Sequence, residues 1–178
     1  MKLFEKTVIV AVCGSLVFSV AAAALQEQAT KQEQMREVRQ KLSGVRPPET
    51  EFDFVTFDLS RTTVILRGFT VGEERKQNCG KAVQEIPWVG HVLNYVEALS
   101  DGYNDEKLRS RIRFIMRQRV PILFSDNRAR IRIKVNSGSV TLIGAVPEDE
   151  EEALKRAIGE IKVEDLVRSV ENKTVLRK

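Results

Sequence analysis

Reactive side chains are scarce in this chain of 178 residues, which has one histidine, two cysteines and ten glycines. Transition-metal sites draw on several histidine and cysteine ligands, and a serine nucleophile needs a positioned histidine. His91 has no second histidine or cysteine near it, so we expect an ordinary surface or hydrogen-bonded residue. The glycines are scattered and form no phosphate-binding loop. The contiguous acids at 148–152 fit helix-end electrostatics better than an acid–base pair. We therefore predict that the protein is not an enzyme and uses no metal, no cofactor and no small-molecule substrate.

Residues 1–24 have the pattern of a secretory signal peptide. A positive start with Lys2 precedes an apolar run at 7–20, and four alanines at 21–24 offer small residues for cleavage. An uncleaved membrane anchor is the competing interpretation, because residues 7–25 could just span a bilayer, which needs about 20 residues. The pattern favours cleavage, since the alanines end the run and no basic stop follows.

Cleavage would leave Cys79 as the remaining thiol. One thiol cannot form an intrachain disulfide, so a disulfide framework is excluded. We expect Cys79 to act as a small buried hydrophobic residue rather than as a reactive thiol.

A short apolar pattern occurs twice, 76 residues apart, which indicates a tandem repeat. The first copy is Val55, Phe57, Leu59, Val64, Leu66 and Gly68, and the second is Ile131, Ile133, Val135, Val140, Leu142 and Gly144. Alternation predicts a hairpin in each copy, with a helix before it and a helix and a last strand after it. The predicted fold is α+β, with two tandem αββαβ modules, each a small three-stranded mixed sheet packed by helices. Residues 25–99 would form the first module (leading helix 26–43, core 51–99), 100–104 a linker, and 105–178 the second module.

Helix ends are predicted from local signals. The sequence at 70–73, Thr-Val-Gly-Glu, has the capping-box pattern, and Asn104 is a suitable N-cap for the helix that follows. That helix should end near Val120, because Pro121 cannot continue it. Its buried stripe is predicted to consist of Leu108, Ile112, Ile115 and Met116.

The hairpin ends resemble those of BON domains. The segments 64–68 and 140–144 both read V-x-L-x-G, and 89–94 and 167–172 resemble the "GV-x-x-V-x-N" element before the last BON strand. The chain is thus similar to exported tandem BON proteins of the osmotically inducible periplasmic type. The resemblance implies a noncatalytic module of the periplasm or cell envelope, associated with phospholipid surfaces and with osmotic or envelope stress.

Basic residues are concentrated between residues 105 and 134, which hold ten bases and three acids. Arg113, Phe114 and Arg117 lie off the predicted apolar stripe, and Arg109 belongs to the same basic helix. A helix that offers arginines around an exposed aromatic ring could rest on an anionic membrane surface. The alternative is that Phe114 packs against the first module and the arginines are solvated.

Arg130, Arg132 and Lys134 alternate with apolar residues, so they should share the outward face of one strand. They form either a second anionic contact or, as we favour, the solvent side of a sheet that pairs with the acidic helix. Nucleic acid is an unsuitable partner, because the protein is predicted to be exported and aromatic residues do not interleave the bases. The predicted function is binding of anionic phospholipid at the envelope, and the alternative is interaction with an envelope protein.

Overall fold

The computed structural model describes residues 30–45, 51–124 and 131–178. The predicted signal peptide lies outside these residues. None of the described helices is long and apolar enough to cross a membrane. The chain divides into two units, residues 1–40 and 41–178. A helix covers residues 30–45. Its last residues, from Lys41 on, belong to the second unit. There Lys41 Nζ donates to Glu85 Oε2 at 3.2 Å.

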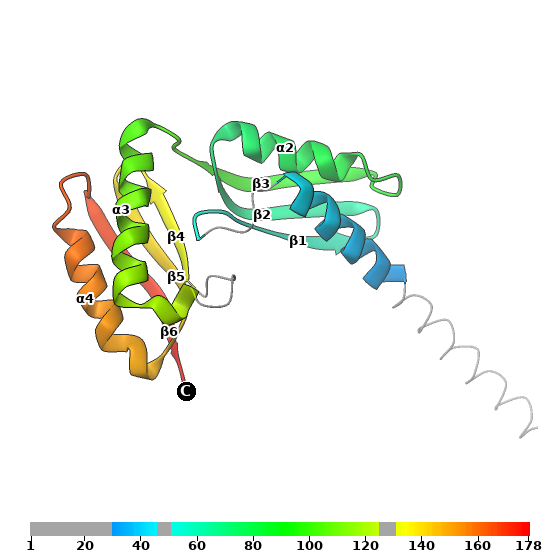
Figure 1. Ribbon diagram of the computed structural model, residues 1–178. Coiled ribbons are helices and arrows are strands. Elements are labelled where there is room, and N and C mark those ends of the chain that lie inside the picture. Colours follow the sequence, from blue (N-terminus) through cyan, green and yellow to red (C-terminus); the bar gives the residue numbers. More distant parts are fainter. Residues whose placement is uncertain (1–29, 46–50, 125–130) are drawn as a thin grey trace, which may run out of the picture. The chain divides into compact units, whose positions relative to one another are not determined.

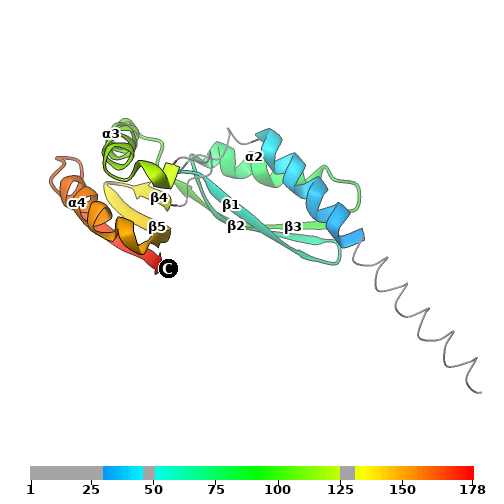
Figure 2. The same cartoon turned by 60° about the horizontal axis from the view of Figure 1, so that its bottom comes forward.

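The first sheet contains β1 (Phe54–Ser60), β2 (Thr63–Val71) and β3 (His91–Leu99) in the order β1-β2-β3. β1 and β2 form an antiparallel hairpin, and β3 runs parallel to β2 after the crossover helix α2 (Glu73–Gln84). α2 lies over one face of the sheet in both Figure 1 and Figure 2. Cys79 and Val83 of this helix are buried, so the prediction that Cys79 is buried is confirmed.

The second sheet repeats this topology. It contains β4 (Ile131–Asn136), β5 (Ser139–Pro147) and β6 (Ser169–Arg177) in the order β4-β5-β6, with β4 antiparallel and β6 parallel to β5. The helix α3 (Tyr103–Arg119) and the short 3-10 helix η1 (Pro121–Phe124) precede it, and η2 (Glu148–Glu150) and α4 (Glu151–Lys162) lie between β5 and β6. α3 and α4 cover the same face of the sheet (Figure 2). The predicted α+β fold of two repeated modules, each with a mixed three-stranded sheet, is confirmed.

The repeat extends to strand register. Val55 pairs with Gly68 in the first hairpin, and Ile131 pairs with Gly144 in the second. Both glycines have positive φ, 112° and 143°. A Cβ at Gly68 would lie 1.9 Å from the carbonyl oxygen of Phe54, so the hairpin twist needs glycine there. The glycine that closes each pattern is therefore a backbone requirement.

One residue from before the first hairpin belongs to the core of the second module. The predicted stripe of α3 is buried together with the inward side chains of β4 and β5. Phe52, which precedes β1, lies in this same cluster and is 2% exposed. The backbone N–H of Ile133 on β4 donates to the carbonyl oxygen of Glu51 at 2.7 Å. The two modules thus share a buried segment at Glu51–Phe52.

Both predicted helix caps are wrong. Thr70 lies in β2, and its hydroxyl donates to the buried carboxylate of Asp53 at 2.6 Å, so Gly72 stands at the N-cap of α2 without a side-chain hydrogen bond. Asn104 lies inside α3, whose N-cap is Gly102. The strand β2 continues to Val71, three residues beyond the hairpin end expected at Gly68, so Thr70 belongs to the strand rather than to the helix end.

Candidate functional site

The outer face of α3 carries the exposed aromatic residue that the sequence singles out. Leu108, Ile112, Ile115 and Met116 are buried as predicted. Because these residues hold one side of the helix against the sheet, Phe114 is turned outward and is 51% exposed. The alternative prediction, that Phe114 packs against the first module, does not describe this side chain.

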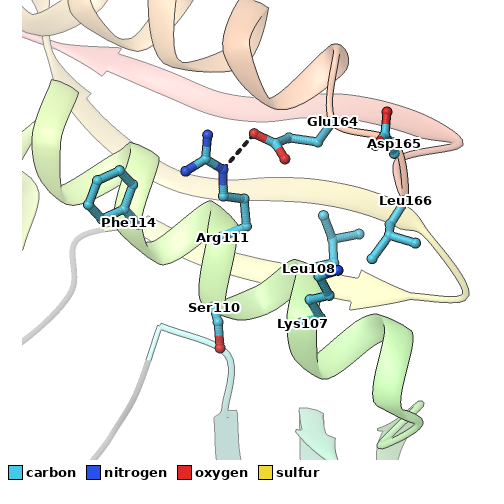
Figure 3. A pocket seen from close by; sticks show the side chains of 8 residues that line it. All are labelled: Lys107, Leu108, Ser110, Arg111, Phe114, Glu164, Asp165 and Leu166. Carbon is cyan, nitrogen blue, oxygen red and sulfur yellow. Dashed lines mark hydrogen bonds and ion pairs between the residues drawn. The ribbon is translucent and has the colours of Figure 1, made fainter.

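A hollow of about 660 Å³ lies beside Phe114, between α3 and the segment that follows α4. Lys107, Ser110 and Arg111 line it from the helix, and Glu164 and Leu166 line it from the segment. Figure 3 shows these side chains around the hollow. Arg111 Nε donates to Glu164 Oε1 at 2.7 Å, and its guanidinium lies 5.4 Å from the centre of the Phe114 ring. One arginine thus bridges an acid and an exposed aromatic ring.

Arg113 pairs with a buried acid of the protein itself. Its Nε donates to Glu51 Oε1 at 2.5 Å, and its guanidinium stands 5.0 Å from the centre of the Phe52 ring. Glu51 is 5% exposed at the side chain and Arg113 is 39% exposed. A buried carboxylate requires a partner of this kind, because desolvation of an unpaired charge is costly. Arg113 is therefore committed to the segment shared by the two modules.

Arg109 is the predicted site residue that the structure removes from the surface. It is 2% exposed. Its Nη1 donates to the carbonyl oxygen of Ser100 at 2.8 Å, and its Nε donates to Glu106 at 3.2 Å. Five N–H donors in a rigid plane suit this structural role, in which Arg109 binds the Ser100 carbonyl oxygen before α3. The prediction that Arg109 belongs to an exposed binding surface is wrong.

Two further bases on α3 remain on the outside. Arg117 is exposed, and its guanidinium lies 5.8 Å from the centre of the Phe124 ring. Lys107 is also exposed, at the rim of the hollow. Arg119 is paired with Glu160 of α4 at 2.6 Å. The basic helix therefore offers less uncompensated charge than its sequence indicates.

The bases of β4 face the first module instead of open solvent. Lys134 Nζ donates to Glu97 Oε2 of β3 at 2.5 Å. The guanidinium of Arg132 lies 5.0 Å from the centre of the Phe54 ring. Arg130 lies outside the described residues. The prediction that this strand pairs with the acidic helix is thus wrong for Lys134, whose acid comes from the other copy of the repeat.

A buried acid that sequence reasoning missed fixes the start of α3. Asp105 accepts hydrogen bonds from the backbone N–H groups of Ser137 and Gly138, at 2.7 and 2.9 Å. Burial by itself raises the pKa of Asp105, but these N–H groups, the Ser100 side chain and the charge of Arg109 together lower it below the usual value. The Asn-Ser-Gly-Ser sequence of the β4–β5 turn signals exposed N–H groups, yet it does not say which acid receives them.

The described residues contain no group of three or more histidine, cysteine or acidic side chains arranged to hold a metal ion. His91 is exposed at the start of β3.

Neither a protein-family model nor a curated protein matches this sequence. Two solved chains of CdsD, a structural protein of the type III secretion system of Chlamydia trachomatis, are similar in structure. One is 13% identical, with 80% of this chain and 91% of that chain covered, at a TM-score of 0.30. The other, its C-terminal domain, is 12% identical, with 80% and 96% covered, also at a TM-score of 0.30. At this level the similarity says nothing about a shared function.

Proposed function

We propose that this chain is a noncatalytic, exported interaction module of the cell envelope that binds a partner protein through the outer face of α3. We name this face the Phe114 surface and define it by Lys107, Ser110, Arg111, Phe114 and Arg117. The observation that carries the proposal is the half-exposed Phe114 ring beside a hollow, with Arg111 against it. Aromatic and arginine side chains dominate the energetic centres of protein interfaces.

The ion pairs on α3 favour a protein partner over a lipid surface. Docking on anionic lipid gains about 1 kcal/mol for each basic residue near the surface. Three arginines of α3 already have carboxylate partners: Arg111 pairs with Glu164, Arg119 with Glu160, and Arg113 with Glu51. These pairs reduce the field that a membrane would feel. A protein partner, in contrast, can use the ring, the hollow and the fixed geometry of Arg111.

Anionic phospholipid is the second candidate, and one observation favours it. Lys107 and Arg117 are exposed, and no carboxylate of the described residues pairs with either of them. Two such bases beside an exposed phenylalanine are sufficient for weak docking that salt would weaken.

Envelope location and the BON assignment belong to this proposal too. The predicted signal peptide supports export, and the repeated αββαβ topology with glycine at 68 and 144 agrees with the BON resemblance. Sequencing the amino terminus of the protein isolated from its native envelope tests export directly. A mature chain that begins near residue 25 is expected. A cytoplasmic protein that retains Met1 would exclude it.

Site-specific photo-crosslinking tests the partner. A photoreactive phenylalanine analogue replaces Phe114 in one variant and the exposed Tyr95 of β3 in the control, and both are expressed in the native host. We expect a discrete protein adduct from position 114 alone, which Lys107→Glu/Arg117→Glu weakens. Equal adducts from both positions, or none from position 114, would contradict the proposal.

Vesicle flotation separates the second candidate from the first. Purified protein is mixed with phosphatidylglycerol-containing or purely phosphatidylcholine vesicles at low and high salt. Flotation with the anionic vesicles that is lost in Phe114→Ala and in high salt would favour the phospholipid function. Recovery that is equal for both vesicle types would remove it.

A further inference from the structure

The strand β6 forms one edge of the second sheet. It has nine residues, Ser169–Arg177, and pairs with β5 along its whole length. In the strand order β4-β5-β6 it has no neighbour among the described strands on its other side (Figure 1). An edge of this length presents backbone groups to which an extended chain can add as a further strand.

The open face of β6 carries a base, an aliphatic residue and a base in a row. Side chains alternate along a strand, so Lys173, Val175 and Arg177 point to the same face. Their neighbours on β5 are Ile143, Ala145 and Pro147, and all six line one hollow of about 1210 Å³. This is the face that α3 and α4 do not cover, and Phe54 of the first module also lines the hollow. Lys173 and Arg177 are four residues apart, which places their Cα atoms about 13 Å apart in an extended strand.

Two consecutive apolar side chains of β6, one on each face of the sheet, are exposed. Val175 on the open face is 60% exposed, and Leu176 on the helix face is 46% exposed. Leu176 pairs with Val146, which is fully buried, so its exposure comes from its place at the sheet edge. An added strand would cover both side chains at once.

The charged side chains of β6 indicate which kind of strand can add to its edge. Lys173, Arg177 and Lys178 outnumber the two acids, Glu148 and Asp149, that line the same hollow. Glu171, which pairs with Lys173 at 3.0 Å, is the acid on the strand itself. Two copies of β6 paired antiparallel about Val175 would place Lys173 opposite Arg177, and like charges on neighbouring strands are destabilising. Acidic side chains on the added strand would instead lie beside each base.

A side chain of β6 occupies the middle of the edge. The backbone N–H and the hydroxyl of Thr174 both donate to Asn172 Oδ1, at 3.1 and 2.8 Å. The first module has the same arrangement on β3, where the N–H of Val96 donates to Asn94 Oδ1 at 3.2 Å. A strand that pairs with β6 would have to replace Asn172 at the Thr174 N–H. Asn172 thus competes with any added strand for the Thr174 N–H, and we call this contact the asparagine gate.

We propose that β6 binds an extended segment of a partner protein that carries acidic, aliphatic and acidic side chains at alternate positions. The segment adds to the edge of the sheet as a fourth strand. Its two acids lie beside Lys173 and Arg177, its aliphatic residue covers Val175, and its backbone displaces Asn172 from Thr174. This inference is independent of the Phe114 surface, which lies on the helix layer of the same module.

A synthetic peptide tests the recognition. The probe is a fluorescent peptide in which glutamate, valine and glutamate alternate with threonine, and fluorescence anisotropy measures its binding to the full chain. We expect saturable binding by this peptide and none by the same peptide with lysine in place of glutamate. Hydrogen exchange should slow at the β6 amides on binding. The absence of saturable binding, or equal binding of the lysine peptide, would overturn the proposal.

Charge reversal locates the site. Lys173→Glu/Arg177→Glu should weaken binding of the probe by about tenfold or more, because two attractive cross-strand pairs become repulsive. The matched control is Arg156→Glu/Lys162→Glu, which makes the same change in net charge at exposed positions of α4. The control should bind as the unaltered chain does. Equal weakening by both variants would mean a nonspecific charge effect and would overturn the site.

The gate distinguishes strand addition from simple adhesion to the open face. Asn172→Ala removes the competitor for the Thr174 N–H, so affinity for the probe should rise severalfold. A probe with methylated backbone nitrogens on the edge-facing side cannot complete the ladder and should not bind. Unchanged affinity in Asn172→Ala together with full binding of the methylated probe would refute strand addition.

Discussion

Replacing Phe52 by alanine should destabilise the second module, although Phe52 precedes the first strand of the first. Its ring is 2% exposed and lies in the cluster formed by α3, β4, β5 and α4. The Arg113 guanidinium stands 5.0 Å from the ring centre. Truncation removes the apolar contacts, leaves a cavity and takes away the cation–π partner.

The magnitude follows from burial and from the local backbone. Fully buried Phe→Ala changes cost about 3–5 kcal/mol, and the cost falls where the surroundings can close over the cavity. Phe52 lies in a turn rather than in a strand, so part of the segment can relax. We therefore expect a loss of about 3 kcal/mol in the free energy of unfolding. For a chain of this size that corresponds to a fall of roughly 6–12 °C in Tm.

Two probes of unfolding identify which module responds. Trp88, the single tryptophan, lies between α2 and β3 and reports on the first module through its fluorescence. Far-UV circular dichroism reports on both modules, and urea unfolds the protein. The matched control is Phe54→Ala, because Phe54 is half-buried in β1 and should cost about 1 kcal/mol.

The reasoning would be refuted by a loss below about 1 kcal/mol in Phe52→Ala, or by equal losses in the two variants. It would also be refuted if the Trp88 transition shifted while the remaining circular dichroism transition stayed in place. The second result would mean that Phe52 stabilises the module in which it lies in sequence.

The remaining predictions concern buried charges and glycine. Arg113→Ala leaves the Glu51 carboxylate without this partner and should cost about 2 kcal/mol by urea denaturation, with Glu51→Gln/Arg113→Ala costing less than the sum of the single changes. The fold lowers the pKa of Asp105, so its stabilisation is present above the unfolded value of 3.8 and is lost as pH falls through the lower folded value. Asp105→Asn should therefore cost about 2 kcal/mol at pH 7 and flatten the stability profile below pH 3.8; an unchanged profile would contradict this. Gly68→Ala should cost more than about 2 kcal/mol, because a Cβ would meet backbone at 1.9 Å, whereas Gly159→Ala in α4 meets nothing within 4 Å and should gain about 0.5–1 kcal/mol; equal effects in thermal denaturation would refute both.

The repeated framework could be predicted because it rests on local patterns. Alternation at 55–59 and 131–135 specifies strands with one buried face, and the glycine at each hairpin end allows a close backbone approach. The stripe of α3 follows in the same way from helical spacing. Each of these signals lies within a few residues of the element that it specifies.

Contacts between distant segments carry no such signal. Nothing near Phe52 indicates that its ring leaves the first module, because its partners lie about 60 or more residues further along the chain. The exposure predicted for Arg109 was wrong for another reason. Its guanidinium can be buried because two nearby groups, the Ser100 carbonyl oxygen and the Glu106 carboxylate, accept its hydrogen bonds. The sequence around Thr70 resembles a helix cap, but the Thr70 hydroxyl donates to Asp53, which lies 17 residues earlier in the chain.

The differences between the two copies decide which edge strand can recognise a partner. Tyr95 and Glu97 of β3 occupy the register positions of Lys173 and Val175 of β6, as their pairing with Arg67 and Phe69 and with Ile143 and Ala145 shows. Glu97 is already paired with Lys134 of the second module. The edge of β3 therefore lacks a base–aliphatic–base row, and its acid is committed to the other copy. Because both copies share the asparagine gate but β6 alone has the row, recognition of an acidic segment follows from the residues that duplication did not preserve.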